Sequence, residues 1–305
     1  MHCGIPTRRA GAAIALVALL YGCGAPVAPG RPGDRIPVVA AENFWGSLAA
    51  QLGGERVTVT NVITNPDADP HAYEPTASDA RAFANARLVV FNGVGYDPWA
   101  PKLLAADAPR GRVVLNVGDV VGARTGTNPH RWYAPADVLR VIDGITAGYK
   151  RLAPAEGAYF DHRHSDFVST SLRPYLLRIS AIRTRYAGTP VGASESIFVP
   201  LADALGLDLR TPIGFLNAIS EGSDPTSADK ATADRQMRSG AIKVYVFNSQ
   251  NSTPDVKAEL VEAKAAGIPV APITETLSPR QATFQDWQDG QLQHLELALA
   301  QATGR

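Results

Sequence analysis

The sequence predicts an α/β protein of two lobes, each a parallel β-sheet flanked by helices, bridged by one long α-helix. Short apolar runs rich in β-branched residues alternate with helical patterns in both halves of the chain. This alternation is typical of parallel sheets joined by right-handed crossovers. A long helical stretch separates the two alternating regions, and 305 residues with 45% hydrophobic content are enough for two cores.

The first lobe is expected to contain four strands, each a short apolar run. Strands are predicted at residues 36–41, 57–63, 87–92 and 113–116, with helices at 43–52 and 78–84. Asn43 is the expected cap of the first helix, and Gly53-Gly54 its stop signal.

The middle of the chain is predicted to be helical. Apolar residues recur at helix spacing in residues 136–152 and again in residues 155–186. At 1.5 Å per residue the second helix would be about 45 Å long, enough to run along two lobes. Pro174 is expected to kink or break it.

The alternating pattern then restarts and predicts a second lobe. Strands are predicted at residues 190–193, 242–247 and 268–273, with helices at 198–205, 255–265 and 283–300.

The N-terminal segment predicts export and a lipid anchor. Arg8 and Arg9 precede an apolar run at residues 10–20, which is too short to span a bilayer. The following Leu-Tyr-Gly-Cys resembles a bacterial lipobox, although its Tyr21 is bulkier than usual, and predicts that Cys23 is acylated. The alternative is an ordinary signal peptide with a chance cysteine.

These observations give a domain organisation. A lipoprotein signal peptide (1–22) and a Pro/Gly/Ala-rich flexible tether (23–35) precede an N-terminal lobe (36–153), a linking helix (154–187) and a C-terminal lobe (188–305). The charge balance of 29 basic and 29 acidic residues gives no indication of nucleic-acid binding.

Four metal-donor side chains follow predicted strands. They are His71, His130, Glu195 and Glu275, two from each lobe. Ligands of open α/β sheets bind beyond the carboxyl ends of the strands, so these side chains can converge if the lobes face each other. Two imidazoles and two carboxylates suit a borderline divalent ion such as zinc or manganese.

The two histidines have matching surroundings. Each follows a proline and precedes an aromatic residue by two positions, in Pro70-His71-Ala72-Tyr73 and Pro129-His130-Arg131-Trp132. Proline restricts the unbound loop, which lowers the entropy lost on ligand binding. A single loop histidine is more often a surface residue, but two matched loops favour a metal site.

Several segments resemble one known family, the solute-binding proteins of zinc and manganese ABC importers. Asp-Pro-His-Ala-Tyr-Glu-Pro (69–75) resembles its first ligand loop and Asn-Pro-His-Arg-Trp (128–132) its second. Ala-Ser-Glu-Ser-Ile-Phe (193–198) resembles the third ligand segment and Ile-Thr-Glu-Thr-Leu (273–277) the fourth, where Asp is commoner. Residues 92–99 resemble a further family segment.

The resemblance implies that His71, His130, Glu195 and Glu275 bind one transported metal ion, zinc or manganese. It also implies the two-lobed fold, an extracytoplasmic location at the cell membrane, delivery to an ABC permease and a monomer. Ala134 stands where the family usually has Asp, so His130 is expected to be less firmly oriented. The segment 118–128 contains no histidine, unlike the His-rich loop of many zinc-specific members.

The sequence leaves two alternative functions. A secreted zinc metallohydrolase could use the same four residues, but the sequence contains no His-Glu-x-x-His motif to supply a general base. A surface adhesin could use the same fold, although no sequence feature favours it. The sequence therefore predicts a binding protein and not an enzyme.

Overall fold

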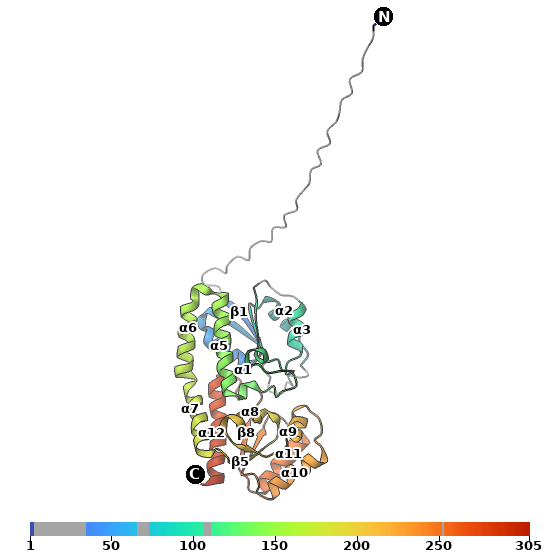
Figure 1. Ribbon diagram of the computed structural model, residues 1–305, viewed down its shortest axis with the longest axis vertical. Helices are drawn as coiled ribbons and strands as arrows, with labels where there is room; N and C mark the ends of the chain where they lie inside the picture. Colours follow the sequence, from blue (N-terminus) through green and yellow to red (C-terminus); the bar gives the residue numbers. More distant parts are fainter. Residues whose placement is uncertain (3–34, 66–72, 107–110, 252) are drawn as a thin grey trace. The chain divides into compact units, whose positions relative to one another are not determined.

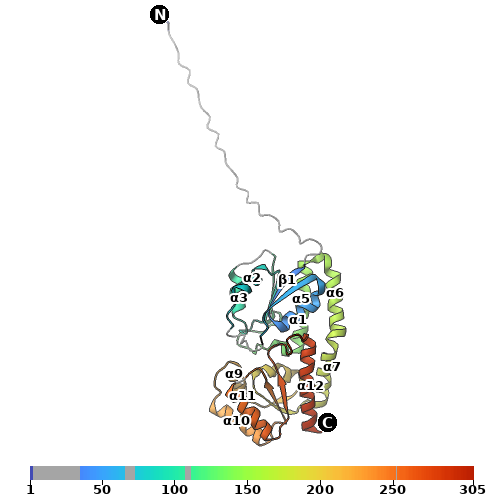
Figure 2. The same cartoon turned by 180° about the vertical axis from the view of Figure 1, so that it is seen from behind.

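The computed structural model describes residues 1–2, 35–65, 73–106, 111–251 and 253–305. The stretch Gly33–Arg305 forms one compact unit. It contains two parallel four-stranded sheets, each with helices on both faces (Figures 1 and 2). The predicted fold class is confirmed.

The first sheet has the strand order β2-β1-β3-β4. Its strands are β1 (Ile36–Glu42), β2 (Val57–Ile63), β3 (Leu88–Phe91) and β4 (Val113–Asn116). Its helices are α1 (Asn43–Gly53), α2 (Ala77–Asn85), α3 (Trp99–Ala106), α4 (Val117–Val121) and α5 (Pro135–Leu152). Along β1, Val38 and Ala40 face the core beneath α1 and α5, whereas Val39 and Ala41 face the core beneath α2 and α3. Burial on both faces explains why the strand is a continuous apolar run.

The second sheet repeats this plan with the order β6-β5-β7-β8. Its strands are β5 (Pro190–Ala193), β6 (Asp208–Leu209), β7 (Val244–Asn248) and β8 (Val270–Ile273). Its helices are α8 (Val199–Leu205), α9 (Ile213–Ser220), α10 (Ser227–Arg238), α11 (Pro254–Ala265) and α12 (Phe284–Thr303). The sequence did not predict β6, because two residues cannot show a periodic pattern.

The linking helix is interrupted earlier than predicted. It consists of α6 (Gly157–Asp166), a π-helical turn at Phe167–Ser171 and α7 (Arg173–Tyr186). Pro174 lies in the first turn of α7, where its missing N–H needs no partner. The wider turn lies just before it, with the Leu172 N–H bonded to the Phe167 carbonyl five residues back, at 2.8 Å.

A second helix also joins the two lobes. α12 packs beside α7 and reaches α1 of the first lobe with its N-terminal end (Figures 1 and 2). The Phe284 N–H donates to Ser47 Oγ at 2.9 Å, and the Gln285 amide donates to Gln51 Oε1 at 2.8 Å. Asn43, predicted to cap α1, is instead its first residue and accepts a bond at 3.3 Å from the Leu277 N–H of the second lobe.

Aromatic side chains fill the space between the lobes. The ring of Phe44 lies 4.3 Å from that of Trp132 and 6.2 Å from that of Trp287, stacked on both. Trp287 also donates its indole N–H to Thr274 Oγ1 at 2.7 Å. One continuous core therefore runs from the first lobe into the second.

We expect Trp287→Ala to lower the free energy of unfolding by about 3–5 kcal/mol, because it leaves a large cavity where both lobes meet. Urea unfolding of the two proteins measures the difference. Leu297→Ala is the control, since this side chain on the same helix is 67% exposed and its loss should change stability by at most about 0.5 kcal/mol. Equal losses in the two variants would contradict the proposed coupling of the lobes.

Candidate metal site

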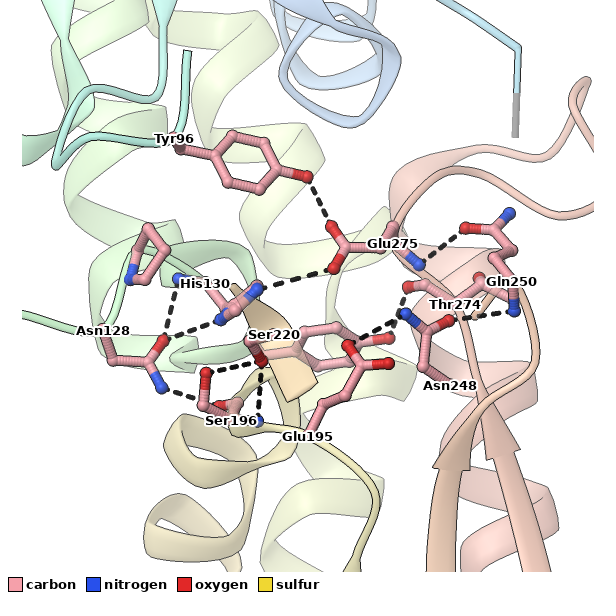
Figure 3. A network of polar contacts seen from close by, with 12 residues as sticks. Tyr96, Asn128, His130, Glu195, Ser196, Ser220, Asn248, Gln250, Thr274 and Glu275 are labelled. Carbon is pink, nitrogen blue, oxygen red and sulfur yellow. Dashed lines mark hydrogen bonds and ion pairs between the residues drawn. The ribbon is translucent and has the colours of Figure 1, made fainter. Parts of the chain in front are cut away.

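The candidate site lies where the carboxyl ends of strands from the two sheets meet. Glu195 and Glu275 each lie two residues beyond the last residue of a strand, β5 and β8 respectively. His130 precedes a short 3-10 turn, Arg131–Tyr133, that leads into α5. Figure 3 shows that His130 from the first lobe and the two glutamates from the second point toward one another.

Two of the predicted functional residues are not tested by the structure. The ligand candidate His71 and the lipidation candidate Cys23 lie outside the described residues. The described chain on either side of His71 is the end of β2 and the approach to α2. Ile63, the last residue of β2, lies opposite Glu42 at the carboxyl end of β1.

His130 is held in one orientation by Asn128. Asn128 Oδ1 accepts the backbone N–H of His130 at 3.0 Å, which identifies this atom as the amide oxygen. His130 Nδ1 lies 2.9 Å from the same oxygen and must therefore carry the proton in the neutral ring. Its Nε2 is left as an electron-pair donor 3.5 Å from Glu275 Oε1.

The predicted weak orientation of His130 is wrong. Ala134 supplies no carboxylate, but Asn128 fixes the imidazole instead and donates its own amide to the Ser196 carbonyl of the second lobe at 2.6 Å. The sequence pattern gave no signal for this role, because an amide in a loop is usually a solvent-exposed turn residue.

Glu275 is fixed at both its side chain and its backbone. Its Oε2 accepts the Tyr96 hydroxyl at 2.5 Å, and its backbone N–H donates to Gln250 Oε1 at 2.8 Å. Burial, followed by the charges of Glu275 and Glu42, raises the pKa of Tyr96, so that the phenol stays a donor. Residues 92–99 resemble a family segment, but no pattern in the sequence indicates that Tyr96 belongs to the site.

Glu195 is buried with incomplete hydrogen bonding. Its side chain is 3% exposed; Oε2 accepts the Asn248 amide at 3.3 Å, and Oε1 has no hydrogen-bond partner among the described residues. Burial, with the charge of Glu275 adding to it, raises the pKa of Glu195 from 4.5 to about 7. A cation bound between the two glutamates would offset both effects.

The described residues hold only part of a metal site. No group of three His, Cys, Asp or Glu lies close enough to hold a metal ion within residues 35–65, 73–106, 111–251 and 253–305. The structure brings His130 and Glu275 together and places Glu195 where it is affected by the charge of Glu275.

A second pair of carboxyl groups, those of Asp97 and Glu42, lies close to Tyr96. The sequence did not predict this pair. Asp97 accepts the backbone N–H groups of Asn92 and Gly93, both at 2.7 Å, and so fixes the turn that carries Tyr96. Glu42, at the end of β1, is fully buried, and its carboxyl group lies within hydrogen-bonding reach of the Asp97 carboxylate. Burial and the nearby Asp97 raise the pKa of Glu42, which favours its neutral form.

Comparison with known proteins gives a family and several relatives. The family of the periplasmic zinc-uptake complex component A matches residues 38–298. A manganese-binding lipoprotein of Halalkalibacterium halodurans is 28% identical over 43% of this chain and 44% of its own length. An iron-binding protein of Yersinia pestis is 28% identical over 55% of this chain and 58% of its own length. The chain thus spans about half the length of these relatives.

The fold also matches solved structures. A manganese-bound mutant of a periplasmic metal-binding protein from Candidatus Liberibacter asiaticus superposes with a TM-score of 0.73 at 21% identity, over 87% of this chain and all of that one. This similarity supports the two-lobed architecture.

The raised pKa of Glu195 predicts a pH dependence of the metal-free protein. An acid with a higher pKa in the folded chain binds more protons when folded, so stability should fall as the pH rises from about 4.5 to about 7. Removing this group as Glu195→Gln should abolish about 3 kcal/mol of that fall. Urea unfolding in the presence of a chelator, across this pH range, measures it.

Glu221→Gln provides the control, because it makes the same chemical change at an exposed position. It should leave the pH profile as in the wild type. If Glu195→Gln also kept the wild-type profile, Glu195 would not titrate near neutral pH.

Proposed function

The chain belongs to the family of the periplasmic zinc-uptake complex component A, and on that premise we propose that it captures a divalent transition metal, zinc or manganese, between its lobes and delivers it to an ABC permease. Members of this family are components of metal-uptake complexes, in agreement with the prediction of a binding protein and not an enzyme. The membership favours transport over the metallohydrolase and the adhesin considered from the sequence.

The observation that carries the proposal is the meeting of His130 and Glu275 across the lobes, beside the buried Glu195. A neutral imidazole nitrogen and two carboxylates are suitable ligands for a borderline divalent cation. Two charged carboxylates in a buried site are unfavourable unless a cation lies between them. The arrangement therefore supports a bound ion of charge +2.

His71 is proposed as the fourth ligand. Its segment connects β2 with α2, and β2 ends beside the end of β1 at the carboxyl edge of the first sheet. With His71 the protein would supply two nitrogen and two carboxylate ligands. Transport requires no chemical step, so all positions around the ion can be occupied by protein.

Attachment to the outer face of the cell membrane through a lipid on Cys23 is likewise a proposal. The Halalkalibacterium halodurans relative is named as a lipoprotein, and the sequence before Cys23 supports the same processing. Within the described residues, no helix combines the length and the apolar character needed to cross a bilayer.

We expect the purified mature protein to bind about one equivalent of zinc or manganese, and a His71→Ala/His130→Ala double variant to bind neither tightly, because it loses both nitrogen ligands. Elemental analysis and isothermal titration measure this. His162→Ala/His294→Ala is the matched control, since both of its histidines are exposed, and it should bind as the wild type does. A wild type that takes up no metal would refute the proposed function.

A further inference from the structure

Asn248 occupies a position between the two glutamates of the second lobe. It is the last residue of β7, the strand that pairs with β5 and β8, after which Glu195 and Glu275 follow. Its side chain is 2% exposed and lies beside that of Glu195 (Figure 3). A buried amide at this position can contact the ion-facing carboxylates without adding a charge.

The orientation of the Asn248 amide is determined by its neighbours. Its Oδ1 accepts the backbone N–H of Gln250 at 3.0 Å, so this atom is the oxygen and the other is the donor. Its Nδ2 then donates to Glu195 Oε2 at 3.3 Å. Its own backbone N–H donates to Ser194 Oγ at 3.0 Å, which fixes Asn248 to the strand that leads to Glu195.

As a result of this contact, the two carboxylate oxygens of Glu195 have different surroundings. Oε2 is engaged by the amide, while Oε1 is buried and has no hydrogen-bond partner in the described part of the chain. Glu275 is divided in the same way, since Oε2 accepts the Tyr96 hydroxyl and Oε1 faces His130 Nε2. In the proposed site, Glu195 would thus present Oε1 to the ion.

The number of available oxygens affects which ion fits. Carboxylates that each bind through one oxygen keep the number of donors low, and zinc prefers four donors in a tetrahedral site. Manganese prefers about six mainly oxygen donors, a number that is approached more closely when a carboxylate binds through both of its oxygens. The coordination number therefore depends on what occupies the second oxygen of each carboxylate.

We propose that Asn248 is a specificity-determining positioning residue, which restricts Glu195 to one oxygen donor and so favours zinc over manganese. This inference rests on the proposed metal-binding function. It concerns the selectivity between the two ions, and not the binding of an ion as such.

The test compares Asn248→Leu with the wild type by titration with zinc and with manganese. Leucine has a similar size but no amide, so Glu195 Oε2 becomes available to the ion. The ratio of the manganese Kd to the zinc Kd should fall about 10- to 100-fold, the range typical of groups that orient metal ligands. The cobalt(II)-loaded variant should lose the intense visible absorption of a four-coordinate ion.

Gln250→Leu is the matched control, because it removes an amide from the same segment that contacts the backbone of Glu275 and not a carboxylate. It should weaken both ions alike and leave the Kd ratio unchanged. Asn248→Ala, with folding checked by circular dichroism, replaces the leucine variant if that one does not fold.

The outcomes separate the two proposals. A wild type that binds zinc, with the Kd ratio and cobalt spectrum unchanged in the Asn248 variants, would overturn the role of Asn248 and leave the proposed function intact. A wild type that binds neither zinc nor manganese would overturn both.

Discussion

The stacking of Phe44, Trp132 and Trp287 is the interaction on which the two lobes and the site depend. Phe44 comes from α1, Trp132 from the turn that follows His130, and Trp287 from α12. Trp132 is fully buried among these three rings, so the backbone of the nearby His130 is held by the core that both lobes share. The position of the ligand is therefore set by large apolar side chains, whose packing is hard to rearrange, and not by the loop alone.

The polar side chains that contact the candidate ligands do not neutralise the negative charge of the two glutamates, so this charge can attract a cation. Asn128 accepts the ring N–H of His130, Tyr96 donates to Glu275 and Asn248 donates to Glu195, and all three side chains are neutral. An arginine or lysine in these places would stabilise the empty site and compete with the ion. Neutral donors orient the carboxylates while their charge remains uncompensated, and this difference favours the loaded state.

The sequence predicts the elements whose apolar residues follow a regular pattern, and the residues that come just after them. Strands at 57–63 and 113–116 have the predicted bounds, and Glu195 and Glu275 were identified because they follow strands. Tyr96, Asn128 and Asn248 were missed because a hydroxyl or amide at a strand end or in a loop has no periodic pattern. The same holds for the bridging role of α12: amphipathic spacing shows that a helix is packed, but not against which lobe. These features depend on contacts between residues far apart in the chain.

Under the proposed function, loading and release of the metal would involve the same buried carboxylate oxygens. When the site is empty, Glu195 and Glu275 repel each other, and burial raises the pKa of Glu195 to about 7. A proton on Glu195 relieves this repulsion, as a divalent ion does, so that proton and metal compete for one position. The lobes are joined by both α7 and α12, which limits large opening movements. The hydrogen bond from Tyr96 to Glu275 is one of the cross-lobe contacts that an opening movement would have to break. In the proposed site, protonation of Glu195 would therefore accompany release of the ion, while the two connecting helices would keep the movement of the lobes small.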